Sequence, residues 1–243
     1  MTDSGQTFDR KEDDPLLAKG VRSPRPKDAA TLILVRLAPI SRKVEVLMGK
    51  RSSRHAFMPD KYVFPGGRVE ASDGRVPSAT ELHEKTADQL AFATRRRARA
   101  FALSAIRETF EETGLIVGTS APRDRRKLPA DWESYFDLGA IPSLYGLRFV
   151  GRAITPPYRP KRYDARFFMA NAEEALIDDR PPVDGAELSD LQWINLEDAL
   201  HLDLPSVTQF MIGEVGERVQ NPSKQPAPSF LRWTRTGHKM TRI

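Results

Sequence analysis

Three glutamates in one short stretch have the spacing of a metal site built on a helix. Glu108, Glu111 and Glu112 stand at positions i, i+3 and i+4, which lie on one face of an α-helix. Three carboxylates on one face offer oxygen ligands to a hard cation such as Mg²⁺ or Mn²⁺. Arg107 can hold the carboxylate of Glu111, and Gly114 supplies a left-handed helix end. The same pattern also describes a solvated, glutamate-rich helix face, so its context decides between the two.

A second motif precedes the glutamates. Val63 and Phe64 form an apolar run that ends in Pro65-Gly66-Gly67, which predicts a strand entering a loop whose backbone can approach a ligand closely. Together the motifs resemble the signature of the Nudix hydrolases, which is Gly, five residues, Glu, seven residues, and then Arg-Glu-U-x-Glu-Glu-x-Gly-U, where U is aliphatic. The second half of the signature matches Arg107 to Leu115, with Thr109 at the first U position.

The first half of the signature departs from the family pattern. Asp73 stands where the pattern has Glu. Gly67 and Arg107 are 40 positions apart where the pattern needs 14, so about 26 residues are inserted. A split signature of this kind resembles the branch of the family that includes the mitochondrial and peroxisomal acyl-coenzyme A diphosphatases and their bacterial relatives.

The resemblance implies an α/β fold, an α/β/α sandwich with a mixed β-sheet and a helical insertion inside the Nudix box at about 74–98. It also implies an enzyme that hydrolyses a diphosphate bond with Mg²⁺ or Mn²⁺. The expected metal ligands are Glu108, Glu111 and Glu112. Arg107 is expected to orient them, and Gly66 and Gly67 are expected to lie against metal and substrate.

Several Nudix enzymes take their general base from a mobile acidic loop, because carboxylates bound to metal are poor proton acceptors. Glu187 is the first choice here, since it precedes the strand that leads to Trp193. Asp184 is the second choice, and Glu173 or Glu174 the third. The expected catalytic residues are therefore Arg107, Glu111 and Glu187.

The substrate is expected to be a nucleoside diphosphate derivative, with coenzyme A or acyl-coenzyme A ranked above ADP-ribose or a nucleotide sugar. Arg51 and the arginines of the Arg162-Tyr163-Asp164-Ala165-Arg166 stretch resemble the coenzyme A branch and are candidates for substrate binding. Ala56 stands where that branch has an arginine. Arg51, Arg54 or the run Arg95–Arg97 would have to pair with a 3′-phosphate instead. Strand-edge arginines paired with acidic neighbours are the alternative reading of Arg162 and Arg166.

The remaining elements follow from hydrophobic pattern and turn residues. Strands are expected at 29–37 and 43–51, as an antiparallel pair, and again at 148–157 and 162–170. The domain is expected to span 28–217, between a flexible N-terminal segment at 1–27 and a C-terminal tail at 218–243. Three apolar residues of this tail could anchor it in an edge strand or form a homodimer contact: Phe230, Leu231 and Trp233.

Composition sets broad limits. The chain has 243 residues, 40% of them hydrophobic, no long apolar run and no cysteine, so we expect a soluble, cytoplasmic protein without a membrane span or disulfides. Its net charge of +5 suits an anionic small molecule. The basic run at 95–99 lacks interleaved aromatic residues, which argues against a nucleic-acid partner. The alternative of an inactive Nudix-fold binding module is disfavoured because all three glutamates are present.

Overall fold

The computed structural model describes residues 23–53, 58–90, 94–122, 128–223, 225–234 and 237–243. Its helices are η1 (Asp73–Arg75), α1 (Glu84–Gln89), α2 (Arg95–Thr113), α3 (Ala130–Asp137), α4 (Ala172–Ala175), α5 (Leu196–Ala199) and α6 (Ser206–Gln220). Its first strands are β1 (Lys27–Leu37), β2 (Val44–Arg51), β3 (Tyr62–Val63), β4 (Gly66–Arg68), β5 (Gly118–Ser120) and β6 (Ala140–Pro142). The later ones are β7 (Arg148–Ile154), β8 (Tyr163–Asn171), β9 (Leu188–Asn195), β10 (Ser229–Thr234) and β11 (Gly237–Arg242).

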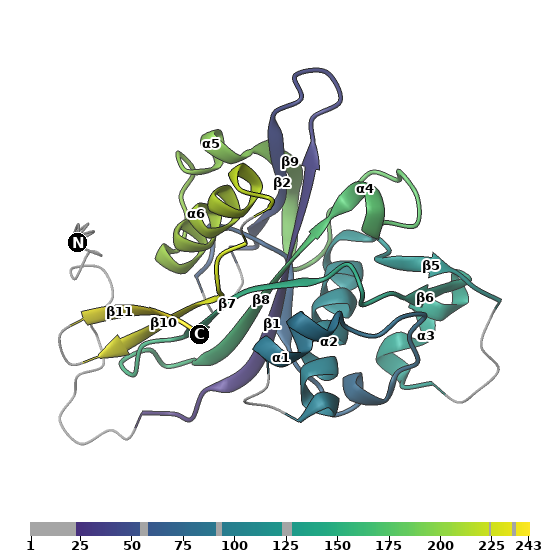
Figure 1. The fold of residues 1–243 in the computed structure, drawn as a ribbon, viewed down its shortest axis with the longest axis horizontal. Coiled ribbons are helices and arrows are strands. Elements are labelled where there is room, and N and C mark those ends of the chain that lie inside the picture. The colour runs from purple at the N-terminus through teal and green to yellow at the C-terminus, as the bar shows by residue number, and fades with distance from the viewer. Residues whose placement is uncertain (1–22, 54–57, 91–93, 123–127, 224, 235–236) are drawn as a thin grey trace.

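A mixed sheet forms the centre of the molecule (Figure 1). Its strand order is β11-β10-β7-β8-β1-β2-β3, with β4 also paired to β1 and β9 to β2. β1 runs parallel to β8 and antiparallel to β2, and β7 is antiparallel to β8. β5 and β6 make a separate small sheet. The expected α/β fold with a mixed sheet and its two strand pairs is confirmed.

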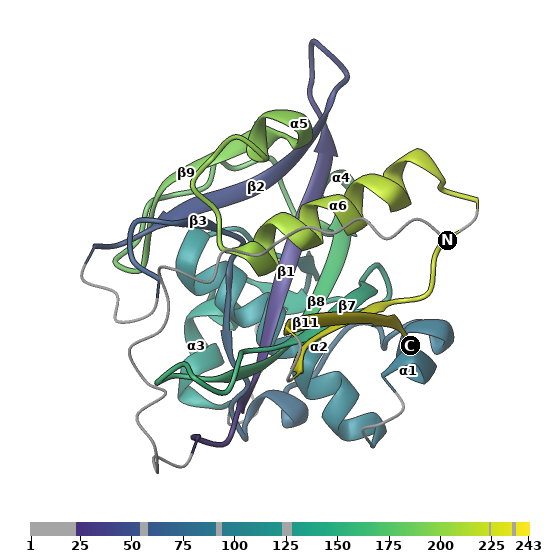
Figure 2. The ribbon, with the colours of Figure 1, turned by 90° about the vertical axis from the view of Figure 1, so that its left-hand side faces the viewer.

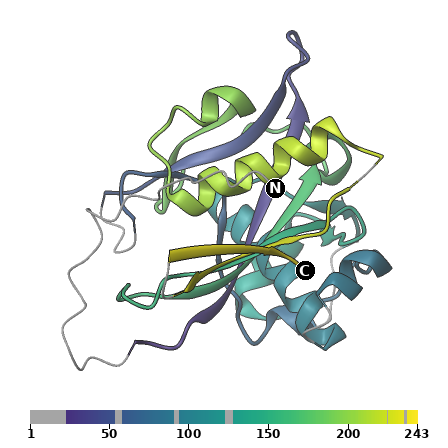
Figure 3. The ribbon, with the colours of Figure 1, turned by 60° about the vertical axis from the view of Figure 1, so that its left-hand side comes forward.

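Helices cover both faces of the sheet, with α2 on one side and α6 on the other (Figures 2 and 3). Alternate residues of β1 supply the two cores, because successive side chains of a strand point to opposite faces. Leu32 and Leu34 belong to the apolar cluster that includes Phe101 and Ile106 of α2. Ile33 belongs to the cluster of α6. β1 is therefore buried on both faces.

α2 carries the signature. It is capped by Thr94, whose side chain accepts a hydrogen bond from the Arg97 amide, and it ends at Gly114 with φ +72°. Phe101, Ala102 and their apolar neighbours bury one side, which leaves the glutamates on another. No helix among residues described by the structure is long and apolar enough to cross a membrane.

The insertion differs from the helix expected at 74–98. Its described residues form only the η1 turn and the short α1 before α2 begins at Arg95. Thr80, which lies outside the helices, accepts from the amides of Leu144 and Tyr145, and Thr86 of α1 donates to the Leu147 carbonyl, so both tie the insertion to the loop before β7. Tertiary contacts therefore outweigh helix propensity here.

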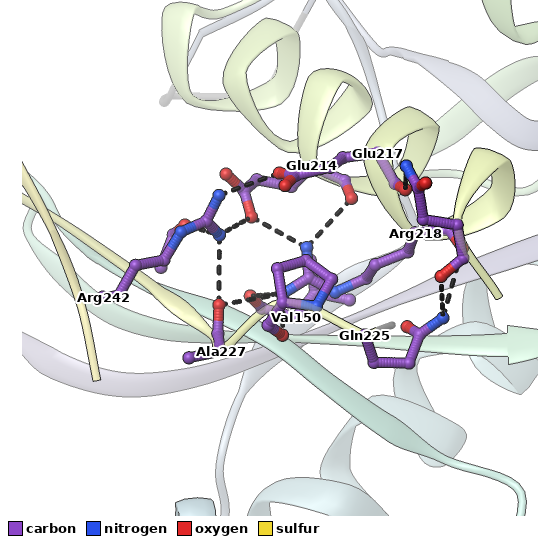
Figure 4. A network of polar contacts seen from close by, with 10 residues as sticks. Val150, Glu214, Glu217, Arg218, Gln225, Ala227 and Arg242 are labelled. Atoms are coloured by element: carbon purple, nitrogen blue, oxygen red, sulfur yellow. Dashed lines mark hydrogen bonds and ion pairs between the residues drawn. The ribbon is translucent and has the colours of Figure 1, made fainter. Parts of the chain in front are cut away.

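The C-terminal segment also differs from the expected tail. α6 continues to Gln220, beyond the expected boundary at 217, and β10 and β11 then add to the sheet beside β7. Leu231 is buried in the α6 core, so the edge-strand alternative holds for this segment. Figure 4 shows the C-terminal network that fastens the hairpin, made of Glu214, Glu217, Arg218 and Arg242. These ion pairs and the buried leucine explain why the segment is ordered despite its polar composition.

Candidate active site

Arg107 lies at the centre of the candidate site and is only 5% exposed. Its Nη1 lies 2.9 Å from Oε1 of Glu108 and 3.0 Å from Oε2 of Glu111. Its Nη2 donates a hydrogen bond to the carbonyl of Arg68, which follows the paired glycines. Burial opposes the charge of Arg107, but the hydrogen bond with Asp73 and the neighbouring carboxylates outweigh it and raise its pKa. Arg107 therefore stays charged and holds two of the three expected metal ligands.

Asp73, the departure from the signature, performs a clear structural task. It is fully buried and accepts hydrogen bonds from Nε and Nη2 of Arg107, at 3.0 and 3.2 Å. The indole Nε1 of Trp132 donates to the same carboxylate at 3.0 Å. Sequence reasoning missed Trp132, because its contact with Asp73 joins residues 59 positions apart and leaves no periodic signal.

The glycine pair brings backbone against the glutamates. Gly66 and Gly67 belong to β4, which pairs with the start of β1, and the Gly66 amide donates to Oε2 of Glu112 at 2.8 Å. A Cβ atom at Gly67 would lie 2.3 Å from the Glu108 carboxylate, and one at Gly66 would lie 2.6 Å from the Ala30 carbonyl. Gly66 therefore needs glycine, whereas a side chain at Gly67 would displace the Glu108 carboxylate from the main chain.

Burial and mutual repulsion raise the pKa values of the three glutamates. Burial raises the pKa of Glu108 to about 7 despite the opposing effect of Arg107, and the charges of Glu111 and Glu187 add to the rise. Burial likewise raises the pKa of Glu112 to about 8, although the Gly66 amide lowers it. The pKa of Glu111 is raised too, chiefly by burial. A cation beside these groups would relieve their repulsion.

The donor set suits a hard divalent cation. It consists of carboxylate oxygens only, a cation would stabilise the ionised forms of Glu108 and Glu112 against their raised pKa values, and Gly67 leaves no side chain between the loop and Glu108. Within the described ranges, however, no three acidic or imidazole groups already form a metal-binding cluster. Glu108 and Glu111 lie against Arg107, and Glu112 lies against the Gly66 amide. The three expected ligands are thus neighbours, but their carboxylates do not converge on a single point.

Two further expected residues lie near the glutamates. The charge of Glu187 raises the pKa of both Glu108 and Glu112, and the charge of Arg51 lowers that of Glu112. The two residues come together because β2 pairs with β9, and the Ser52 amide donates to the Glu187 carbonyl at 3.0 Å. Glu187 is exposed to solvent.

The other base candidates are held in local contacts. Asp184 accepts hydrogen bonds from the amides of Asp190 and Leu191, at 2.8 and 2.9 Å, and so closes its own loop. The Glu174 side chain accepts a hydrogen bond from Asn171, and the Glu173 amide is capped by the same asparagine. Glu187 is the candidate whose charge reaches two of the glutamates.

Arg162 and Arg166 have structural partners, which corrects the expectation that they grip the substrate. Arg166 is 2% exposed, pairs with Asp28 and Asp164, and stacks over Phe101 at 4.1 Å. Arg162 donates to the Thr155 carbonyl and to residues that precede β1. The sequence resemblance that identified these arginines could not tell an arginine buried beneath α2 from one facing a ligand.

Two arginines of the basic run at the start of α2, Arg97 and Arg99, are likewise engaged in ion pairs. Arg97 pairs with Asp28 at 2.6 Å, and Arg99 pairs with Glu81 of the insertion at 2.9 Å. These contacts favour the structural reading of the run. Arg54 and Ala56, which bear on the 3′-phosphate expectation, lie outside the described residues.

Similar proteins point to one family. No family model matches the sequence. The acyl-coenzyme A diphosphatase NUDT19 of Gallus gallus is 27% identical over 239 alignment positions, which cover 72% of this chain and 62% of the relative. A Caenorhabditis elegans protein named as a nudix hydrolase is 30% identical over 182 positions, covering 69% of this chain and 51% of the relative. The chain thus spans between half and two thirds of the length of these relatives.

A solved structure agrees with the sequence relatives. The crystal structure of a NUDIX hydrolase from Alicyclobacillus acidocaldarius superposes with a TM-score of 0.60 and 25% identity, over 78% of this chain and 90% of that one. The same family thus emerges from the signature, from the sheet with its glutamate-bearing helix, and from the relatives. The chain is thus similar to Nudix hydrolases, and among its relatives are acyl-coenzyme A diphosphatases.

Proposed function

We propose that the chain hydrolyses the diphosphate bond of a nucleoside diphosphate derivative with the help of Mg²⁺ or Mn²⁺. The observation that carries this proposal is the surplus of buried carboxylate around Arg107 and the Gly66-Gly67 backbone. A surplus of negative charge is costly in a folded protein unless a cation offsets it. Diphosphates are the anions that such a cation would bring to the site.

Each residue has a distinct task in this proposal. Glu108, Glu111 and Glu112 would hold the metal, and Arg107 orients the first two through its ion pairs. When bound, the divalent cation neutralises phosphate oxygens and lowers the pKa of water for attack on phosphorus. Gly67 lets the main chain lie directly against the Glu108 carboxylate, and the Gly66 amide holds Glu112.

Glu187 is our choice for the base that takes the proton from the attacking water. Its carboxylate is exposed, lies in the loop before β9, and acts electrostatically on Glu108 and Glu112. A base at that position can exchange its proton with solvent after each turnover. A carboxylate bound directly to metal could not do so as easily.

Coenzyme A or acyl-coenzyme A is the substrate that we rank first. The resemblance to an acyl-coenzyme A diphosphatase and the cation of Arg51 beside the site support this choice. Hydrolysis would release 3′,5′-ADP and a 4′-phosphopantetheine product. The insertion gives no separate support, because it packs on the loop before β7 through Thr80 and Thr86. ADP-ribose or a nucleotide sugar is the alternative.

A substrate panel tests the proposal. Acetyl-coenzyme A, free coenzyme A, ADP-ribose, NADH, dinucleoside polyphosphates and nucleoside triphosphates are assayed with Mg²⁺ and with Mn²⁺. We expect metal-dependent turnover, with the highest kcat/KM for a coenzyme A compound. A higher kcat/KM for ADP-ribose would overturn the substrate ranking. Tight binding of a nucleotide without any turnover would favour an inactive binding module.

A further inference from the structure

Trp132 is joined to the candidate active site through a single buried carboxylate. Oδ1 of Asp73 accepts hydrogen bonds from Nε of Arg107 and from Nε1 of Trp132, each at 3.0 Å. Oδ2 accepts from the Glu70 amide at 2.9 Å and from Nη2 of Arg107 at 3.2 Å. Asp73 and Trp132 are fully buried. Four donors thus fix the carboxylate, and Trp132 is the donor that comes from outside the signature and its insertion.

The Trp132 ring is held independently of this hydrogen bond. Its edge contacts with Tyr135 and Phe136 of α3 have centroid distances of 5.3 and 6.2 Å. Because packing fixes the ring, its N–H points in one direction. The carboxylate of Asp73 alone could rotate more freely, since χ2 of aspartate has a broad torsional preference. The indole N–H therefore selects one orientation of Asp73, and that orientation presents its oxygens to Arg107.

We propose that Trp132 is a positioning residue for the metal site, acting through Asp73 and Arg107 on Glu108 and Glu111. This inference rests on the proposed function. It assigns a task to α3, which lies outside the signature. Loss of the indole N–H would loosen Asp73, and Arg107 would then hold the two glutamates less well.

Trp132→Phe tests the proposal, with Tyr135→Phe as the matched control. Each substitution removes one buried hydrogen bond from α3 and keeps an aromatic ring, but the Tyr135 hydroxyl donates to the Val117 carbonyl, away from Arg107. We expect Trp132→Phe to lower kcat by roughly three- to tenfold, less than is typical for a direct partner of a metal ligand, with KM within about twofold. Tyr135→Phe should keep kcat within about twofold at a similar loss of thermal stability.

The pathway through Arg107 is tested by a double-mutant cycle. In an Arg107→Lys background the guanidinium is absent, so adding Trp132→Phe should lower kcat by less than about 1.5-fold. A full additional loss in that background would overturn the proposal. Equal kinetic effects of Trp132→Phe and Tyr135→Phe would overturn it as well, because they would indicate packing alone.

Nitrogen-15 NMR of the unligated protein supplies a readout besides activity. We expect a nuclear Overhauser contact between the indole proton of Trp132 and the Nε proton of Arg107, since both donate to one oxygen. In Trp132→Phe the Arg107 Nε–H should exchange faster with solvent, and in Tyr135→Phe it should not. If the Overhauser contact is absent in the wild-type protein, the proposal is wrong even where Trp132→Phe does not fold. If these signals behave as expected but no diphosphate is hydrolysed, only the proposed function fails.

Discussion

Arg107 and Arg218 are both buried helix arginines paired with a glutamate four residues away, yet their surroundings differ. Arg218 and Arg242 face Glu214 and Glu217, so the C-terminal network is balanced in charge, and Arg218 also donates to the Val150 carbonyl (Figure 4). Arg107 alone faces Asp73, Glu108 and Glu111, with Glu112 close by.

The difference shows which feature distinguishes a functional site from a structural ion pair. A buried arginine with a carboxylate partner occurs in both regions, and in the C-terminal network it fastens β10 and β11 to α6. Surplus carboxylate occurs around Arg107, where main-chain glycines adjoin it. Charge balance predicts a structural role, and unbalanced buried acid predicts a missing cation.

The largest expected effect is on kcat. The same Glu→Gln change should lower kcat strongly beside Arg107 and hardly at all in the C-terminal network. Glu111→Gln and Glu112→Gln, made singly, should lower kcat by roughly two to four orders of magnitude, because each removes a charge from the metal site at constant volume. Glu217→Gln in the C-terminal network is the control and should keep kcat within about twofold. Steady-state kinetics of the three purified variants with Mg²⁺ decide the matter. Near-normal rates for Glu111→Gln or Glu112→Gln would remove that residue from the ligand set.

A smaller loss is expected at the base. Glu187→Gln should lower kcat at neutral pH by roughly 100-fold and abolish the acid limb of the pH–rate profile, because the carboxamide cannot accept a proton. Glu174→Gln, on α4, should leave the profile unchanged. A Glu187→Gln enzyme with the wild-type rate and acid limb would exclude Glu187 as the base.

A substitution in the C-terminal network should lower the stability of the protein and leave its turnover nearly unchanged. Arg218→Met removes a side-chain donor from four main-chain carbonyls and one partner of buried Glu214. We expect the free energy of unfolding to fall by about 3 kcal/mol, with kcat of the folded enzyme within about twofold. Urea denaturation followed by tryptophan fluorescence measures the first quantity. A large loss of kcat with unchanged stability would contradict the structural role.

The smallest effect is expected at Arg162. Its contacts lie with the Thr155 carbonyl and with Ser23 and Pro24, so Arg162→Met should change KM by less than about twofold. Initial rates over a range of substrate concentrations test this. A tenfold rise in KM would restore Arg162 to the substrate site and contradict its placement here.

Local signals account for the parts of the molecule that the sequence predicted. The left-handed end at Gly114 and the strand expected at 29–37 each depend on a few adjacent residues. The site was predictable where the signature is contiguous, from Arg107 onward. Gly66 has no room for a side chain against β1, and a side chain at Gly67 would displace the Glu108 carboxylate.

Long-range contacts account for the parts that the sequence did not reveal. Trp132 donates to Asp73 across 59 positions, and the ordered C-terminal segment depends on Leu231 and Arg242 meeting α6. The burial of Arg166 depends on α2 covering β8, which strand periodicity cannot indicate. The insertion has helical composition over part of its length, but around Thr80 a side-chain contact with the loop before β7 accompanies a non-helical conformation.

The central claim is that the glutamates of α2 hold a divalent cation for diphosphate hydrolysis. The most direct measurement is the rate of cleavage of acetyl-coenzyme A and of ADP-ribose by the wild-type protein and by Glu112→Gln, with Mg²⁺ and again after chelation. We predict turnover of at least one substrate by the wild type with Mg²⁺, its loss on chelation and recovery on adding metal, and a loss of roughly two orders of magnitude or more in Glu112→Gln. Turnover that persists after chelation, or that is equal in the two proteins, would contradict the claim.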